Sequence, residues 1–176
     1  GGAAGFFCAV NAARLNNQLE VLILERSGKT LSKVKVSGGG RCNVTHQCED
    51  IEEMVRYYPR GTHFLKKAFH HFFVTDMVRW LAERGVQLHT EADGRMFPRS
   101  NQSQTIIDCF LREAERFGVQ VRLHAEVIRL QPAGSGWQVF LSNGSMLEGD
   151  YVCVTTGGLS RQGGCPWLEA LGHHLE

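Results

Sequence analysis

The chain has 176 residues, of which 43% are hydrophobic and 21% are charged, and its formal net charge is +1 at pH 7. This length can bury one sizeable core, and the balanced charge argues against a nucleic-acid partner and against a basic membrane-binding face. No apolar run reaches membrane-spanning length and no signal peptide is visible, so we expect a cytoplasmic protein without a membrane partner.

The first residues carry glycines at the spacing of a dinucleotide-binding turn. Such a turn reads G-x-G-x-x-G, and Gly2 and Gly5 match its second and third glycines, while the first would fall one residue ahead of Gly1. Gly2 would let a pyrophosphate approach the backbone closely, and Gly5 would let the following helix pack tightly on a sheet. The helix expected over residues 3–16 would direct its free N–H groups at the phosphates.

A buried parallel strand is expected next, over residues 19–24, and an acidic residue stands at its end. Glu25 lies twenty residues beyond Gly5, where this fold places the acid that binds the adenosine ribose. A flexible, glycine-rich chain end is the alternative explanation of the glycines. The position of Glu25 favours a nucleotide site, and we include the adjacent Arg26 among the candidate cofactor-binding residues.

The later elements indicate an α/β fold interrupted by other structure. The Asn143–Gly144 pair predicts a hairpin, and residues 151–155 are expected as another buried parallel strand. We interpret residues 1–176 as one partial Rossmann-type domain with a helical segment and a β-meander inserted at about 51–149. Between residues 26 and 147 we expect a loop at 26–50, helices at 51–57, 62–72, 75–84 and 100–117, and strands at 86–89, 119–123, 127–130, 137–141 and 146–147.

A second glycine-rich segment, at residues 37–43, lies just past Glu25. Three consecutive glycines cost backbone entropy on folding, so an ordered run is usually explained by close approach to a ligand; a plain flexible loop is the alternative. Arg41 offers a planar donor for a phosphate or a flavin carbonyl, and Asn43 can both donate and accept. The turn pair Asp93–Gly94 is interpreted first as part of a structural hairpin or of a helix entry, and the alternative is that Arg95 and Arg99 face an anionic ligand.

Together these segments resemble the BaiN/YhiN-like FAD-dependent oxidoreductases. The specific parts are S-G-G-G-R-C-N at residues 37–43 and D-G-R-x-F-P-x-S at residues 93–100, and the resemblance runs from Gly1 to about Gly158. It implies a glutathione-reductase-like Rossmann domain, a parallel sheet with helices, that holds FAD non-covalently. It also implies NADH or NADPH as electron donor and a small organic molecule as substrate.

The resemblance assigns residues to parts of the cofactor. Gly2 and Gly5 would meet the pyrophosphate, and Glu25 the adenosine ribose. The residues expected along the FAD near the flavin are Gly39, Gly40, Arg41, Cys42 and Asn43, and those expected at a second cofactor-contacting strand end are Thr156 and Gly157. The strand ahead of the glycine turn and the substrate domain of such enzymes are not part of this sequence.

The expected reaction is hydride transfer from a nicotinamide to the flavin and from the reduced flavin to an organic substrate. No side chain is identified as a general acid or base. A redox role for Cys42 is considered, but no cysteine at C-x-x-C spacing supports it, and the six cysteines suggest reduced thiols and no metal site. Two alternatives stay open: an FAD-dependent RNA-modifying protein, against which the balanced charge argues, and a non-catalytic remnant of a flavoprotein.

Overall fold

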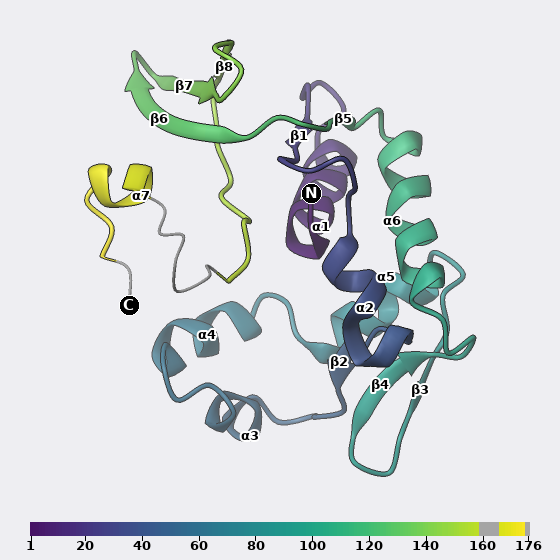
Figure 1. Ribbon diagram of the computed structural model, residues 1–176. Helices are drawn as coiled ribbons and strands as arrows, with labels where there is room; N and C mark the ends of the chain where they lie inside the picture. Colours follow the sequence, from purple (N-terminus) through teal and green to yellow (C-terminus); the bar gives the residue numbers. More distant parts are fainter. Residues whose placement is uncertain (159–165, 175–176) are drawn as a thin grey trace. The chain divides into compact units, whose positions relative to one another are not determined.

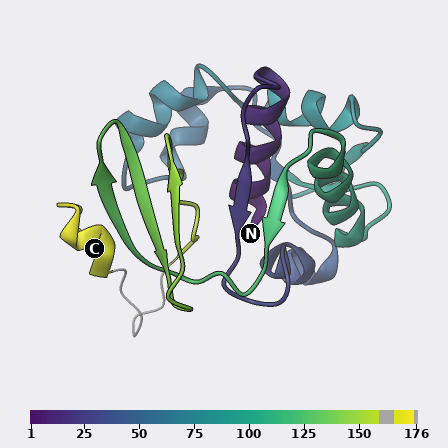
Figure 2. The ribbon, with the colours of Figure 1, turned by 90° about the horizontal axis from the view of Figure 1, so that it is seen from above.

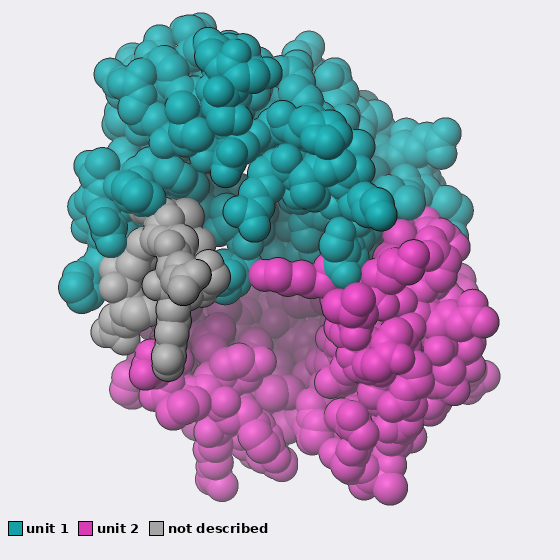
Figure 3. All heavy atoms as spheres, viewed as in Figure 1, with its two compact units in different colours: residues 1–32, 110–176 teal, residues 33–109 magenta. Residues whose placement is uncertain are grey.

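The computed structural model describes residues 1–158 and 166–174, and the chain divides into two compact units (Figure 3). Unit 1 comprises residues 1–32 and 110–176, and unit 2 comprises residues 33–109. The described helices are α1 (Ala3–Leu15), α2 (Ser32–Gly40), α3 (Ile51–Arg56), α4 (Thr62–Phe69), α5 (Val74–Ala82), α6 (Ser103–Arg116) and α7 (Pro166–Ala170) (Figure 1). The described strands are β1 (Leu22–Leu24), β2 (Thr45–His46), β3 (Leu88–Thr90), β4 (Arg95–Pro98), β5 (Gln120–Arg122), β6 (Val127–Ala133), β7 (Gly136–Leu141) and β8 (Met146–Gly149).

Unit 1 contains a parallel pair of strands in contact with a helix. β1 and β5 run side by side (Figure 2), with Leu22 opposite Gln120 and Leu24 opposite Arg122. α1 contacts β1, and its buried side chains recur at helical spacing; they are Phe6, Ala9, Val10 and Ala13. The expected helix and parallel strand are therefore confirmed, with β1 shorter than the six residues predicted.

The buried strand expected at residues 151–155 is not formed. These residues belong to no strand among the described residues, and the side chain of Tyr151 is 89% exposed. An apolar run becomes a buried parallel strand only when neighbouring strands supply its hydrogen bonds and helices cover both faces. Among the described residues no strand pairs with residues 151–155, so the composition of this run alone did not decide its structure.

The helical segment and the meander lie on either side of β5 in the chain. We predicted one insertion at about 51–149, but β5 lies inside that range and pairs with β1. Unit 2 lies between β1 and β5, and the antiparallel meander β6-β7-β8 follows β5. The meander is confirmed, including its turn, where Gly144 has a φ of +83° and the backbone N–H of Ser145 donates to Asn143 Oδ1 over 3.0 Å.

Unit 2 combines helices with a three-stranded antiparallel sheet in the order β2-β4-β3. β3 and β4 form the expected hairpin, with Gly94 at a φ of +85° in its turn. A small core of Cys48, Met54 and Val74 packs with Phe69 of α4 and with Met96 of β4. The loop predicted at 26–50 instead contains α2 and β2. Both are short, and neither has the long hydrophobic periodicity from which an element is recognised in a sequence.

Candidate cofactor site

The start of α1 has the geometry that a phosphate-binding turn requires. Gly2 is the N-cap of α1, with φ −94° and ψ −175°, and a methyl group built on it would meet no atom within 4 Å. A methyl group on Gly5 would lie 2.9 Å from Thr155 Oγ1, so glycine is needed there for close packing. The open space in front of Gly2 suits the close approach of a pyrophosphate to the backbone, and the tight packing at Gly5 suits a helix that lies close to its neighbours.

The carboxylate of Glu25 lies over this turn. A methyl group built on Gly1 would be 2.3 Å from Glu25 Oε2. Ser27 donates to Glu25 Oε1 from its backbone nitrogen over 2.8 Å and from its hydroxyl over 2.7 Å. Partial burial raises the pKa of Glu25, but these hydrogen bonds and the positively charged Gly1 amino group, whose nitrogen lies 3.3 Å from Glu25 Oε2, together hold the pKa below its ordinary value. An ionised acceptor thus stands beside the glycine turn, and Arg26 next to it is exposed.

In unit 2, the second glycine run adopts a backbone conformation that needs glycine. The φ angles of Gly38, Gly39 and Gly40 are +55°, +67° and +89°, all in the left-handed region. A methyl group on Gly38 would lie 2.8 Å from both Asn43 N and Phe97 Cε1. At Gly39 and Gly40 it would meet nothing within 4 Å. Gly38 is therefore needed for the local packing, whereas Gly39 and Gly40 present open backbone to a ligand.

Arg41 is held by the β3–β4 hairpin of its own unit. Its guanidinium lies over the ring of Phe97, 4.0 Å from the centroid, and forms an ion pair with Glu91. Glu91 also accepts from Arg95 Nη2 over 3.3 Å. A guanidinium has five N–H donors, so this arrangement orients Arg41 without using its whole donor capacity. The contact with Glu91 could not be predicted from local sequence patterns, because the two residues are 50 positions apart.

Cys42 and Asn43 complete the run, and both are held by local contacts. Burial raises the pKa of the Cys42 thiol, with a hydrogen bond involving Ser37 opposing the shift, so the thiol stays protonated at neutral pH. That chemistry does not favour the redox role considered for Cys42. With its amide oriented to satisfy both acceptors, Asn43 donates to the carbonyl oxygens of Thr45 over 2.9 Å and of Met96 over 3.3 Å.

The candidate residues fall into two sets. In unit 1, Gly2, Gly5 and Glu25 gather at the start of α1 with Thr155. Thr156 and Gly157 follow Thr155 directly, and both are exposed. Gly157 has a φ of +74°, in the left-handed region. In unit 2, residues 38–43 gather against Phe97. Within the described chain, Thr155, Glu91 and Phe97 are the contacting residues that sequence reasoning did not assign to the site.

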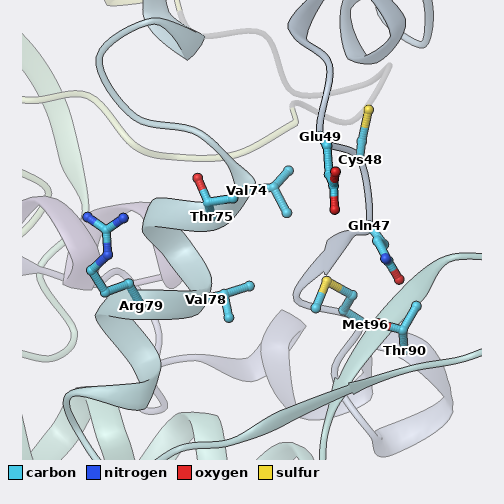
Figure 4. Close-up of a pocket in the computed structure, with 9 residues that line it drawn as sticks. All are labelled: Gln47, Cys48, Glu49, Val74, Thr75, Val78, Arg79, Thr90 and Met96. Atoms are coloured by element: carbon cyan, nitrogen blue, oxygen red, sulfur yellow. The ribbon is translucent and has the colours of Figure 1, made fainter.

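A separate pocket of about 330 Å³ opens in unit 2, between the start of α5 and the strands (Figure 4). Figure 4 shows Val78 facing Met96, while Arg79 points away from it. Successive strand side chains point to opposite faces, so Met96 at the pocket and Phe97 at the glycine run lie on opposite faces of β4. The pocket is therefore distinct from the glycine run. It is lined by Gln47, Cys48, Glu49, Val74, Thr75, Val78, Arg79, Thr90 and Met96.

Two further features concern only the part of the chain that the structure describes. No group of three or more His, Cys, Asp or Glu side chains there is placed to hold a metal ion. No helix in that part combines the length and the apolar character needed to cross a membrane. Cys8, Cys42, Cys48, Cys109 and Cys153 are free thiols, and Cys165 lies outside the described residues.

A glycine turn at the start of a helix, followed by a parallel strand that ends in an acid, defines a dinucleotide-binding domain of the Rossmann type. The chain belongs to the HI0933-like protein Rossmann domain family, whose model matches residues 1–175. This membership confirms the expected Rossmann-type fold and the resemblance to BaiN/YhiN-like flavoproteins, and it supports FAD as the cofactor. The individual cofactor contacts and the nicotinamide donor stay predictions.

Relatives with curated names match nearly all of the chain. The ribosomal RNA dihydrouridine synthase of Escherichia coli (strain K12) is 32% identical over 162 residues, which are 92% of this chain and 39% of that protein. The 3-dehydro-bile acid delta(4,6)-reductase of Clostridium scindens is 27% identical over 158 residues, 90% of this chain and 37% of that protein. The chain thus spans about two fifths of the length of these relatives. The crystal structure of Thermovibrio ammonificans THI4 aligns with a TM-score of 0.49 and 15% identity, covering 81% of this chain and 46% of that one.

Proposed function

We propose that this chain is the FAD-binding part of a flavin-dependent oxidoreductase that reduces an organic substrate, with NADH or NADPH as electron donor. The observation that carries the proposal is the ionised Glu25 carboxylate beside the open N-terminus of α1. A bound flavin supplies the hydride chemistry, and the protein supplies binding and orientation. A cytoplasmic location belongs to the proposal, supported by five described cysteines that are all free thiols.

Each set of residues has a defined task in this proposal. The N–H groups at the start of α1 and the open backbone at Gly2 bind the pyrophosphate, because a helix N-terminus attracts anions. Glu25 accepts hydrogen bonds from the adenosine ribose hydroxyls. The exposed backbone of Gly39 and Gly40 allows the cofactor to approach, and Thr156 and Gly157 contact it from the end of the 151–155 segment.

The names of the relatives suggest what kind of substrate is reduced. One is named for making dihydrouridine in ribosomal RNA and another for reducing a bile acid, so both names describe the addition of hydrogen to an organic molecule. A small organic substrate is one candidate. An RNA substrate is the second candidate, favoured by the two relatives named ribosomal RNA dihydrouridine synthase, at 32% and 29% identity.

A binding experiment tests the role of Glu25. FAD binding is followed by quenching of flavin fluorescence, with ADP and 2′-deoxy-ADP as competitors against the wild type and Glu25→Gln. Loss of the charged acceptor is expected to weaken FAD and ADP by about tenfold or more, because hydrogen bonds to charged groups contribute about 1.5–3 kcal/mol. The wild type should prefer ADP to 2′-deoxy-ADP, and Glu25→Gln should lose that preference. An unchanged preference in the variant would remove Glu25 from the ribose site.

A further inference from the structure

Two exposed cysteines of unit 1 are neighbours in space although they lie far apart in the chain. Cys8 belongs to α1, and Cys153 belongs to the 151–155 segment. The thiol of Cys8 is hydrogen-bonded to the side chain of Cys153. Both cysteines are free and both are exposed, so a small reagent in solution can reach the pair. The proposed function uses neither residue.

The packing of the backbone supports this pairing independently. Gly5 lies one helical turn before Cys8, and Thr155 lies two positions after Cys153. A methyl group on Gly5 would lie 2.9 Å from Thr155 Oγ1. The two contacts share one register, in which the 151–155 segment runs along α1 in the opposite direction. The packing of Gly5 on Thr155 therefore holds Cys153 beside Cys8.

The segment that carries Cys153 has room to adjust. No described strand pairs with residues 151–155, so a small shift of this backbone breaks no hydrogen bond between strands. A disulfide requires a specific separation and orientation of its two cysteines. A segment without strand partners can reach that geometry at lower cost than a strand inside a sheet.

Other uses of a thiol pair fit less well. A structural metal ion takes about four ligands, and no group of three or more His, Cys, Asp or Glu side chains is placed to hold one among the described residues. A thiol nucleophile needs a lowered pKa, whereas partial burial raises the pKa of the Cys8 thiol and the hydrogen bond with Cys153 raises it further. Oxidation of the two thiols to a disulfide needs only their proximity and an oxidant.

We propose that Cys8 and Cys153 form a redox-sensitive site, which hydrogen peroxide oxidises to a disulfide between α1 and the 151–155 segment. The inference goes beyond the proposed function and does not depend on it. The disulfide would fasten to α1 the segment that leads directly to Thr156 and Gly157. A reducing dithiol would open it again.

The reaction has two steps. The thiolate of Cys153 attacks the peroxide, so that an S–O bond forms, the O–O bond breaks, and the departing hydroxide takes up a proton to become water. Cys8 then attacks the sulfur of the resulting sulfenic acid. The S–S bond forms as the S–O bond breaks, and the second hydroxide leaves as water with the proton of Cys8. The two sulfur atoms lose two electrons in total, and one molecule of peroxide gains them.

Peptide mapping tests the site directly. The reduced protein, freed of reductant, is treated with hydrogen peroxide, its remaining thiols are alkylated, and the monomer is digested with trypsin without reduction. Trypsin places Cys8 in residues 1–14 and Cys153 in residues 130–161, each with one cysteine. Mass spectrometry should find these two peptides linked, with two hydrogens fewer than the reduced pair, and dithiothreitol should separate them.

Thermal unfolding gives a second readout. The oxidised monomer should unfold about 5–10 °C above the reduced protein, because the new bond closes a long loop of the chain. Cys8→Ser and Cys153→Ser should each lack both the link and the shift in Tm. An oxidised wild type that carries the link but has an unchanged Tm would overturn the claim that the bond fastens the segment to α1.

A displaced thiol provides the matched control. Cys153→Ser combined with Val154→Cys keeps one exposed thiol in the segment and moves it by one position, and successive side chains of an extended chain point to opposite sides. This variant should form no link to Cys8 and show no shift in Tm. Linkage as extensive as in the wild type would overturn the proposal. So would sulfenic or sulfinic acid on either cysteine without a link, or a link only between two copies of the chain.

Discussion

Gly5 of α1 and Thr155 lie so close that glycine is the residue that fits, since a methyl group at Gly5 would be 2.9 Å from Thr155 Oγ1 and 3.8 Å from Thr155 Cβ. This contact fixes the 151–155 segment against α1 even though the segment joins no described strand. Gly5, the third glycine of the turn, thus allows close packing, and Gly2, the second, leaves open space in front of the backbone.

A double-mutant cycle tests the Gly5 contact. Gly5→Ala is expected to lower the free energy of unfolding by about 1–3 kcal/mol, the usual cost of overpacking. Because the clash is with the Thr155 hydroxyl, Gly5→Ala should cost much less when Thr155→Ala is already present. Urea unfolding of the four proteins gives the coupling energy. Additive effects would show that the two residues do not touch.

Neighbouring glycines of the second run should respond differently to the same substitution. Gly39→Ala meets no atom within 4 Å, so we expect only the left-handed strain of about 1–2 kcal/mol. Gly38→Ala adds a clash with the Asn43 backbone and the Phe97 ring, so its loss of stability should be larger. Thermal unfolding ranks the two variants, and a loss in Gly39→Ala equal to that in Gly38→Ala would contradict this loop geometry.

The pKa of Glu25 predicts how its contribution to stability depends on pH. Its folded-state pKa lies below the ordinary value, so the folded protein favours the ionised form. The stabilisation is present above the unfolded-state pKa and is lost as the pH falls through the folded-state pKa. Thermal unfolding should therefore show Glu25→Gln less stable than the wild type near neutral pH, with the difference shrinking in acid. A difference in stability between the two proteins that grows in acid would contradict a lowered pKa of Glu25.

The features that the sequence predicted correctly are the helix after the glycine turn and the strand that precedes Glu25, and both depend on local spacing. The cofactor contacts of these residues stay a prediction. Gly2 and Gly5 belong to one turn, and Glu25 follows one strand, so few residues determine the arrangement. The hairpin at Asp93–Gly94 was recognised for the same reason. Features that depend on residues close together in the chain can be predicted directly from the sequence.

The features that the sequence did not predict depend on distant partners. The strand expected at 151–155 had the right composition, but hydrogen bonds from a neighbouring strand decide whether such a run becomes a strand. The pairing of Arg41 with Glu91 joins residues 50 positions apart.

The most direct test of the central claim is the flavin absorbance between the near ultraviolet and the blue after FAD is added and the free cofactor is removed by gel filtration. Wild-type protein should retain equimolar FAD. Gly2→Asp has room for its side chain and can cap α1, so it should fold at least as stably, yet its charge would stand where the pyrophosphate binds and should abolish retention. Asn143→Asp adds the same charge at an exposed position of the β7–β8 turn, keeps the oxygen that accepts from Ser145, and should retain FAD. A colourless wild type, or equal retention by Gly2→Asp, would contradict a cofactor site at the start of α1.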